Sequence, residues 1–292
     1  MDINKHRYYM TQVLLAIFQD SELSKLLAFK GGTSLLLFHN LTRFSTDLDF
    51  NLLDKGEIEK VYRRIRNILQ RFGRIEDEAI KFYGAILVLN YGKGERMLKV
   101  EVSTRQYDNH YEVKSLMGTD VRVMTVCDMF AHKLCALGER ITPRDVYDTW
   151  FFLQNRTEIN SNIVRLRTGK SVDEYAKQCA EIVKETSPKA LMQGLGEVLP
   201  DNSSKNFVKR QLITETASLL NLFAQYPLVA NQKNTLRMQM LLENPDLIPM
   251  FESNDVDLST VSEIQLQCML TQNVPQQFYT RGGRIVDLSL SK

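Results

Sequence analysis

The sequence predicts an α+β fold, in which a small mixed-sheet core is followed by a mainly helical C-terminal region. Two segments of the first 120 residues alternate apolar and polar side chains with the period of a β-strand. After residue 120 the apolar period changes to that of a helix and stays there. We therefore expect a core in residues 1–120, a helical domain in 121–198 that completes the functional site, and a C-terminal helical region of unknown role in 199–292.

The elements of the core follow from its apolar patterns. Apolar residues at helical spacing predict helices over 5–19 and 57–72. Between them, Thr33 or Ser34 is expected to cap a short helix that runs to about residue 40. The remaining predicted core elements are strands, over residues 46–53, 85–91 and 96–104.

The second half of the chain has the apolar spacing of helices. In the segment 125–140 the apolar stripe is formed by Val126, Phe130, Leu134 and Leu137. Pro143 is placed to open the next helix, over 144–154. Residues 199–206 are rich in turn formers and predict a linker. Further helices are expected over 172–195, 206–226 and 233–243, and the pattern places nothing in the last fifty residues.

Composition limits the class of protein. Hydrophobic residues make up 43% of the 292 residues and charged residues 25%, the balance of a globular protein with ample core. A net charge of +2 does not by itself indicate nucleic-acid binding. The cysteines lie far apart without a CxxC motif, which favours reduced thiols in a cytoplasmic protein. We find neither a signal peptide nor an apolar run that would span a membrane.

Two aspartates in the segment FKGGTSLLLFHNLTRFSTDLDF predict a metal site. Asp47 and Asp49 alternate with apolar residues on one strand, so both side chains project from the same face with Cα atoms about 6.6 Å apart. Two unpaired carboxylates at this spacing repel each other, and a divalent cation between them removes the repulsion. Mg²⁺ is usually held by one or two carboxylates together with substrate phosphates.

The residues around these acids suit a phosphate. Gly31 and Gly32 let the backbone approach a phosphate closely, and the helix that follows directs free N–H groups at the anion. The hydroxyls of Thr33 and Ser34 lie at the same place. Arg43 and Ser45 precede the acids and are further candidates for phosphate contact. The alternative interpretation is a tight turn, a helix, and a strand with an acidic solvent-exposed face.

A third acid is needed for two-metal nucleotidyl transfer, because the second metal activates the attacking hydroxyl. Glu101 is the candidate, since it lies on the polar face of a predicted strand that can reach the Asp47 and Asp49 strand. The alternative is a solvated glutamate paired with Lys99 or another neighbour.

The segments KGGTSL, RFSTDLDF, KVEVS, AHKLCAL and RDVYD resemble the AbiEii/AbiGii nucleotidyltransferase-like toxin family, part of the DNA polymerase beta nucleotidyltransferase superfamily. The resemblance covers roughly residues 25–155 and says nothing about residues 200–292. It implies a toxin of a two-gene toxin–antitoxin or phage-defence (abortive infection) system, with a cognate antitoxin as a possible partner. It also implies transfer of a nucleotide from an NTP with Mg²⁺, two ions in the two-metal scheme, and for some relatives the acceptor is the 3′ end of tRNA.

The family pattern maps onto named positions of this chain. Its first motif falls on Gly31, Gly32, Thr33, Asp47 and Asp49. The third acid falls on Glu101, where many relatives carry Asp, so the longer side chain alters the metal spacing. The helical motif falls on Lys133, Arg144, Asp145 and Asp148.

The helical motif also has a physical interpretation. Lys133 and Arg140 are seven residues apart and share one helix face. Lys133 can neutralise a triphosphate or the departing pyrophosphate, and Asp145 and Asp148 on the next helix, beside Arg144, can orient Lys133 or Arg140. The alternatives are a solvated lysine and acids favoured by a helix N-terminus.

Three functions remain open from the sequence alone. The first is an NTP-dependent nucleotidyltransferase that acts on RNA. The second is a DxD sugar transferase, which predicts repeated βα units before Gly31, where only a helical segment is expected. The third is a catalytically weak transferase fold with a binding or regulatory role. The basic segment 55–74 is either an RNA-binding surface or a solvated helix face, and no histidine is assigned to a metal.

Overall fold

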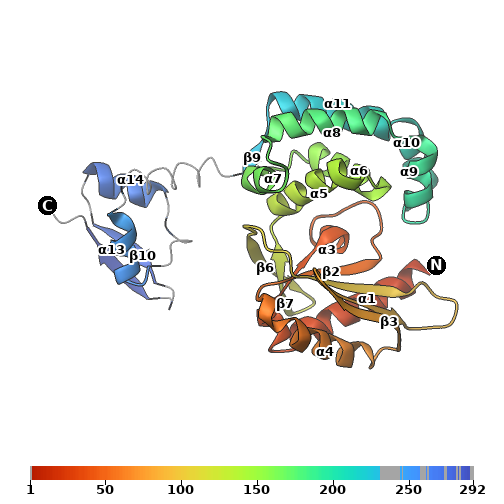
Figure 1. Cartoon of the computed structure of the whole chain (residues 1–292), viewed down its shortest axis with the longest axis horizontal. Coiled ribbons are helices and arrows are strands. Elements are labelled where there is room, and N and C mark those ends of the chain that lie inside the picture. Colours follow the sequence, from red (N-terminus) through yellow and green to blue (C-terminus); the bar gives the residue numbers. More distant parts are fainter. Residues whose placement is uncertain are drawn as a thin grey trace. The chain divides into compact units, whose positions relative to one another are not determined.

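The chain folds into two compact units, Met1–Leu228 and Val229–Lys292 (Figure 1). A computed structural model describes residues 2–230, 244, 246–256, 261, 263–272, 275–280, 282 and 284–289. The first unit contains the sheet and the helices that surround it. The boundary we predicted after residue 198 differs from this division, because the helices over 202–225 belong to the first unit.

A mixed sheet of seven strands forms the centre of the first unit, in the order β3-β4-β5-β2-β1-β7-β6. Its strands are β1 (Leu27–Lys30), β2 (Asp47–Leu52), β3 (Arg74–Lys81), β4 (Gly84–Asn90), β5 (Leu98–Ser103), β6 (Tyr111–Leu116) and β7 (Thr119–Met124). Three of them, β2, β4 and β5, lie within two residues of the predicted strands at 46–53, 85–91 and 96–104.

Strand β2 lies between β1 and β5, and its register places the polar side chains in rows. β2 pairs antiparallel with β1, where Lys30 lies opposite Asp49. It pairs parallel with β5, where Asp47 lies opposite Lys99 and Asp49 opposite Glu101. Residues that pair across neighbouring strands project from the same face. The prediction that Asp47 and Glu101 occupy neighbouring strands of one sheet is therefore confirmed.

The other face of these strands is the core of the unit. Leu48, Phe50, Val100 and Val102 alternate with the polar residues, and all four are completely buried. Helices α1 (Ile3–Gln19) and α4 (Ile58–Leu69) cover this face, as Figure 1 shows. Burying each of these side chains contributes about 1.5–3 kcal/mol, so the hydrophobic side of the alternation holds the polar row in place.

Helices form a second layer on the polar side of the sheet (Figure 1). They are α5 (Val126–Arg140), α6 (Pro143–Gln154), α7 (Ser161–Thr168), α8 (Val172–Lys184), α9 (Pro188–Leu195), α10 (Asn202–Arg210) and α11 (Leu212–Gln225). The predicted stripe of α5 is confirmed, since Phe130, Leu134 and Leu137 are fully buried and Val126 is partly buried against the same core. Pro143 is the first residue of α6, as predicted, and Thr142 caps the helix.

Several predicted boundaries are wrong, each for a local reason. The helix after the glycines, α3 (Gly31–Phe38), begins at Gly31, so Thr33 and Ser34 lie inside it and do not cap it. The predicted helix 172–195 is two helices, because Ser187 and Pro188 begin a new one. The predicted linker is shorter, since Asp201 caps α10 through its contact with the Ser204 N–H.

Four strands of this sheet were not predicted. β1 has only four residues, and β3 carries charged or polar side chains on both faces, so periodicity does not detect them. β6 and β7 have six residues each, as β2 has, and Val121 and Val123 of β7 alternate with Asp120 and Arg122, a pattern that we did not interpret as a strand. The remaining short elements of the first unit are α2 (Leu23–Leu26), a 3₁₀ turn (Lys55–Glu57) and β8 (Ile159–Asn160).

The second unit has its own small core. It contains β9 (Val229–Ala230), α13 (Leu247–Ser253), α14 (Glu263–Gln272), β10 (Gln276–Tyr279) and β11 (Ile285–Leu288). Leu247, Phe251, Leu266, Met269 and Phe278 pack together in it. The predicted helix over 233–243 lies outside the described residues.

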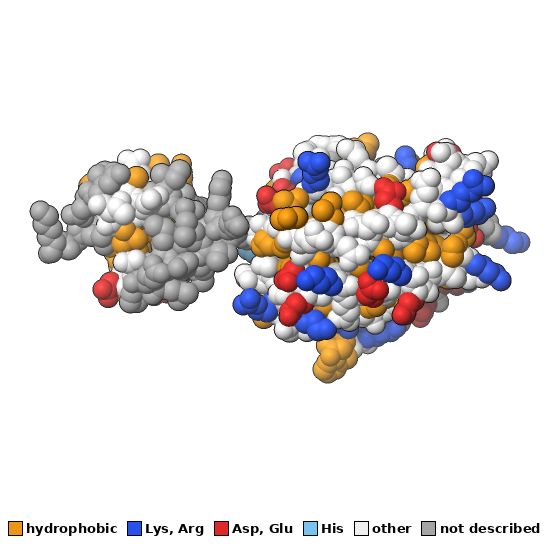
Figure 2. Space-filling view, turned by 90° about the horizontal axis from the view of Figure 1, so that it is seen from above, with side chains coloured by type: hydrophobic (Ala, Val, Ile, Leu, Met, Phe, Trp, Pro, Cys, Tyr) orange, Lys and Arg blue, Asp and Glu red, His pale blue; other side chains and the backbone are white. Residues whose placement is uncertain are grey.

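The basic segment 55–74 makes ion pairs within the unit. Arg64 pairs with Asp20, Arg66 with Glu78 and Arg74 with Glu76. These pairs favour the interpretation of a solvated helix face. On the face of the first unit visible in Figure 2, Lys and Arg side chains are intermixed with Asp and Glu. Among the described residues, no helix is long and apolar enough to cross a membrane.

Candidate active site

A cavity of about 1050 Å³ lies between the polar face of the sheet and the helical layer. The sheet contributes residues from β1, β2 and β5, and the helical side contributes residues from α5, α6, α7 and α9. Asp47, Asp49, Glu101 and Lys133 all line it. Residues predicted from three separate parts of the sequence therefore face one space.

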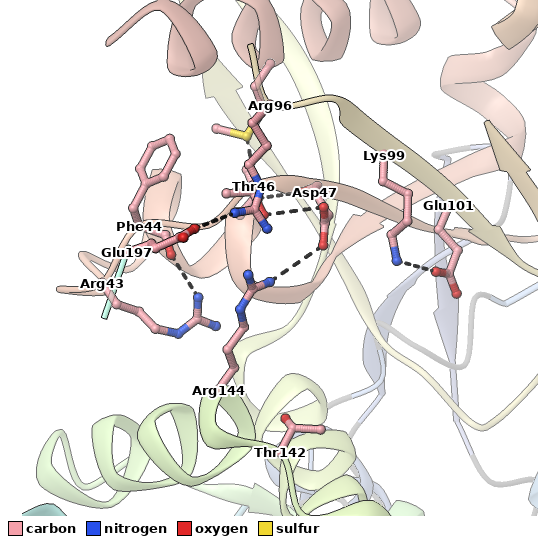
Figure 3. A network of polar contacts seen from close by, with 12 residues as sticks. Arg43, Phe44, Thr46, Asp47, Arg96, Lys99, Glu101, Thr142, Arg144 and Glu197 are labelled. Atoms are coloured by element: carbon pink, nitrogen blue, oxygen red, sulfur yellow. Dashed lines mark hydrogen bonds and ion pairs between the residues drawn. The ribbon is translucent and has the colours of Figure 1, made fainter. Parts of the chain in front are cut away.

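The three acids form a row across β2 and β5, and two of them contact cations. The Arg144 guanidinium reaches from α6 to Asp47, with Nη1 3.7 Å from Oδ2. Lys99 Nζ lies 2.9 Å from Glu101 Oε2, the pairing that we considered as the alternative role of Glu101. Figure 3 shows both pairs and the approach of Arg144 from the helical side. The cations balance charge that would otherwise accumulate in the row.

Asp49 lies between these two pairs and has no such partner. No hydrogen bond or ion pair reaches its carboxylate from the part of the chain that the structure describes. Burial raises the pKa of Asp49, and the nearby Glu101 and Asp47 raise it further against the opposing effect of Lys99 and Lys30. A partly buried carboxylate without a partner is costly, so this position favours a cation.

The donor set of the row fits a divalent metal. Carboxylate oxygens are the ligands that Mg²⁺ prefers, and the unpartnered carboxylate of Asp49 lies at the centre of the row. Among the described residues, however, no three such side chains converge as a formed metal centre. Asp47 and Glu101 are instead directed to Arg144 and Lys99.

The N-terminus of α3 meets the acid row at its two glycines. Gly31 has φ +80°, and a Cβ on it would lie 2.6 Å from Oδ2 of Asp49. A Cβ on Gly32 would lie 2.8 Å from the Ser45 hydroxyl and 2.9 Å from Nη2 of Arg43. Glycine is therefore required at 31 both for its backbone conformation and for the close approach of Asp49. Both glycines and Ser45 line the cavity, where free N–H groups of the first turn favour an anion.

The hydroxyls of Thr33 and Ser34 lie elsewhere. Both residues are completely buried and neither lines the cavity. Thr33 Oγ1 donates to the backbone carbonyl of Asp47 at 2.5 Å, so it fixes the start of β2. The predicted contact of these two hydroxyls with a phosphate finds no support in their positions, because the helix begins two residues earlier than we expected.

Four charged side chains form a cluster beside the cavity: Arg43, Asp145 and Asp148, which are buried, and Lys133, which is partly exposed. Arg43 holds Asp148 through Nε and Nη2, both at 2.7 Å. Lys133 Nζ lies 2.7 Å from Asp148 Oδ2 and 3.0 Å from Asp145 Oδ1. The predicted contact of both aspartates with Lys133 is therefore present. We call these four side chains the charge cluster.

The charge cluster is neutral overall, and each member stabilises the charged form of the others. Burial raises the pKa of Asp148, but Arg43 and Lys133 outweigh it and hold the value below its usual range. Burial lowers the pKa of Lys133, yet Asp148 and Asp145 leave it raised. Lys133 thus stays an ammonium at the cavity wall. Arg140 is more exposed and contacts Asp145 at 3.3 Å, while Thr142 donates to Asp145 at 2.6 Å.

Several cavity residues were not predicted. Lys30 faces Asp49 in the sheet register, and burial lowers the pKa of its ammonium. The sequence signal that could have identified Lys30 as a cavity residue is its position directly before Gly31. Lys and Arg outnumber acids among the described residues that line the cavity, nine to six, which suits a polyanionic ligand. The nine are Lys30, Arg43, Arg96, Lys99, Arg105, Lys133, Arg140, Arg144 and Arg167.

A protein family and several solved structures resemble this chain. The family described as "Nucleotidyl transferase AbiEii toxin, Type IV TA system" matches residues 12–261. Among solved structures, the chain is similar to JHP933 from Helicobacter pylori, at 21% identity over 77% of this chain and 91% of that one, with a TM-score of 0.47. It is also similar to MenT4, a nucleotidyltransferase toxin from Mycobacterium tuberculosis, at 19% identity over 74% and 85% of the two chains and a TM-score of 0.43.

No curated protein matches the chain. The family match spans most of the 292 residues and includes every residue of the acid row and of the charge cluster. The chain therefore belongs to the AbiEii family of nucleotidyl transferase toxins of type IV toxin–antitoxin systems.

Proposed function

We propose that this chain transfers a nucleotide from an NTP to the end of an RNA, most directly the 3′ end of tRNA. The observation that carries the proposal is the placement of Asp47, Asp49 and Glu101 in one cavity with the N-terminus of α3. Acids and an anion site side by side suit a triphosphate whose α-phosphorus lies beside the acids. The enzyme would act in the cytoplasm as the toxin of a toxin–antitoxin or phage-defence system, opposed by a cognate antitoxin.

The reaction needs no redox partner. The terminal hydroxyl oxygen of the acceptor attacks the α-phosphorus of the NTP and forms a new P–O bond. The bond from the α-phosphorus to the bridging oxygen of the β-phosphate breaks, and pyrophosphate leaves with that electron pair. The hydroxyl proton passes to the carboxylates of the row and then to solvent.

Asp47, Asp49 and Glu101 are the residues that would hold Mg²⁺. When bound, the metal supplies charge stabilisation to the attacking and leaving oxygens and makes the acceptor hydroxyl more acidic. The longer side chain of Glu101 fits this role if it leaves Lys99, which lies two residues earlier on the same face of β5.

The triphosphate would occupy the other end of the row. Gly31 and Gly32 offer backbone N–H groups there, and the Ser45 hydroxyl and Arg43 adjoin Gly32. Arg43 is fully engaged with Asp148 and the Phe44 carbonyl, so its charge is offset and it acts mainly by positioning. Lys133 and Arg144 face the cavity and can balance charge on the departing pyrophosphate.

No observation favours the alternative of a DxD sugar transferase. That function predicts repeated βα units before Gly31, and residues 2–30, which the structure describes, form only α1, α2 and β1. The acids, the glycines and a cationic cavity wall are all present, which argues against a catalytically weak fold.

Incubation with each α-³²P-labelled NTP, Mg²⁺ and total RNA tests the proposal. We expect label to enter RNA with the wild-type enzyme, and to be lost with EDTA or in Asp49→Asn. Oxidation of the RNA 3′ termini with periodate beforehand should also prevent labelling, because it removes the attacking hydroxyl. Labelling that survives this oxidation would place the acceptor elsewhere and reject the 3′-end assignment.

A further inference from the structure

The turn between β3 and β4 exposes two neighbouring aromatic rings. Phe82 is 89% exposed, the highest value among the large hydrophobic side chains of the described residues, and Tyr83 is 56% exposed. Their ring centroids lie 4.7 Å apart in an edge-to-face arrangement. Neither ring contributes to the buried core, so the fold alone does not explain two aromatics at a hairpin tip.

This turn belongs to the rim of the cavity. Tyr83 lines the cavity, and the guanidinium of Arg105 lies over its ring at 4.5 Å from the centroid. A second ring at the rim, Tyr107, lies beneath the guanidinium of Arg167 at 5.4 Å. Arg105, Tyr107 and Arg167 also line the cavity. Aromatic rings and guanidinium planes are the surfaces on which unpaired nucleobases stack.

The hairpin is held firmly against β5. Gly84 lies opposite Ser103, and the Thr104 N–H donates to the Tyr83 carbonyl at 3.0 Å. A Cβ on Gly84 would overlap the Val102 carbonyl, so the two strands approach as closely as glycine permits. The backbone at Tyr83 is therefore anchored to the end of β5, which lowers the entropic cost of binding at this turn.

The order of groups along the sheet assigns a partner to these rings. Gly32, Arg43 and Ser45 adjoin the start of β2, at the proposed triphosphate end. β5 runs parallel to β2, and Ser103 lies about 6.6 Å beyond Glu101. The aromatic turn at Ser103 is thus on the far side of the acids from the triphosphate end. In-line transfer requires the attacking and leaving oxygens on opposite sides of the phosphorus.

We propose that Phe82, Tyr83 and Arg105 form a stacking platform for the unpaired nucleotides at the 3′ end of the acceptor RNA. The occupant is a single strand, because paired bases do not expose their faces to aromatic side chains. The excess of Lys and Arg in the cavity complements the phosphates of such a strand. This inference rests on the proposed function and names the acceptor that the site selects.

Binding of two matched RNA hairpins tests the platform without any transfer reaction. Both carry a 5′ fluorophore, and one ends in four unpaired 3′ nucleotides while the other is blunt. Fluorescence anisotropy should show tighter binding of the overhang by wild-type protein, and Tyr83→Ala should lose about 10-fold in affinity for the overhang alone. Phe82→Ala should reduce the same preference, and Tyr83→Phe should retain it, because the ring rather than the hydroxyl stacks.

Tyr8→Ala is the matched control. Tyr8 is also an exposed aromatic, at 61%, set edge-on to the neighbouring ring of Tyr9, and it does not line the cavity. The Tyr8→Ala variant should bind the overhang hairpin and the blunt hairpin with the affinities of the wild type. Equal loss for both hairpins in Tyr83→Ala, or no loss for either, would overturn the platform.

Two further variants separate this inference from the proposed function. Asp49→Asn should keep the overhang preference although it cannot transfer, so a dead enzyme does not hide the platform. Equilibrium dialysis with labelled NTP should give the same affinity for wild type and Tyr83→Ala. Loss of NTP binding in Tyr83→Ala with unchanged RNA binding would assign the rings to the base of the nucleotide substrate and overturn the proposal.

Discussion

The Arg43 guanidinium and the Asp148 carboxylate form a two-point ion pair inside the protein. Nε–Oδ1 and Nη2–Oδ2 are both 2.7 Å, and neither side chain is more than 2% exposed. The two residues are 105 positions apart, so the pair ties the segment before β2 to helix α6. It also supports Lys133, which contacts Asp148 from the cavity side.

Removing one partner of this pair should destabilise the fold strongly. Asp148→Asn leaves the guanidinium of Arg43 without its charge partner, and breaking a buried pair in this way costs about 3–5 kcal/mol. Urea unfolding followed by circular dichroism measures the change. Asp120 is exposed and serves as the control, since Asp120→Asn should change the free energy of unfolding by less than about 0.5 kcal/mol. An Asp148→Asn variant as stable as the control would show that the pair contributes nothing net.

The ion pairs of Asp148 and Asp145 predict that the folded state loses stability in acid. The folded-state pKa values of Asp145 and Asp148 lie below the unfolded value of about 3.9, although burial alone would raise them. A carboxylate of this kind contributes its full stability above the unfolded pKa, and the contribution is lost as the pH falls through the folded pKa. The stability gap between wild type and Asp148→Asn should therefore be constant from pH 7 to about pH 5 and shrink below pH 4. Urea titrations at several pH values measure it, and a gap that widens in acid contradicts the assignment.

Asp49→Asn should separate stability from catalysis. Burial raises the pKa of Asp49, so its charged form opposes folding at neutral pH, and the amide should raise the urea midpoint in the absence of metal. The same change removes a proposed metal ligand and should abolish transfer. Asp77→Asn, at an exposed position on β3, should leave activity and midpoint unchanged. Full transfer by Asp49→Asn would remove this residue from the proposed metal site.

Lys133 should be needed for turnover beyond its part in the charge cluster. We expect Lys133→Ala to lower kcat by roughly 10²- to 10³-fold, the effect of losing one preorganised charge donor. Lys133→Arg should recover only part of this, because a planar guanidinium differs from a compact ammonium. Stability will also fall, since Asp145 and Asp148 lose a cation, so kcat is measured well below the unfolding temperature of each variant. Lys177→Ala, on the exposed face of α8, is the control and should keep wild-type turnover. Wild-type turnover in Lys133→Ala would leave Lys133 with a purely structural role.

The strand positions of the acids could be predicted, because alternation with buried residues determines which way they point. Leu48 and Phe50 alternate with Asp47 and Asp49, and the same period carries Glu101. Helix α5 and its buried stripe were predictable for the same reason, with period 3.6 in place of two. Strand β3 could not be predicted, because its side chains are charged or polar on both faces. Its pairing with β4 depends on tertiary contacts.

The partners of the site residues were harder to predict than their positions. Nothing local in the sequence links Arg43 to Asp148, so we assigned Arg43 to phosphate and did not foresee its burial in an ion pair. The predicted helix cap at Thr33 or Ser34 was wrong because capping preferences favour Thr and Ser over glycine at the start of a helix. Helix α3 instead begins at Gly31, two residues before Thr33. Tyr83 was missed because the turn between β3 and β4 reaches the cavity through the pairing of β4 with β5, which nothing local in the sequence indicates.

One measurement tests the central claim most directly: parallel reactions with α-³²P- and γ-³²P-labelled forms of the preferred NTP and purified tRNA. Nucleotidyl transfer by the Asp47, Asp49 and Glu101 row predicts that the α label enters tRNA and that the γ label is released as pyrophosphate. The opposite distribution, with the γ label in tRNA, would mean phosphoryl transfer and contradict the account. Release of the γ label as inorganic phosphate with no label in tRNA would mean hydrolysis and would contradict it as well.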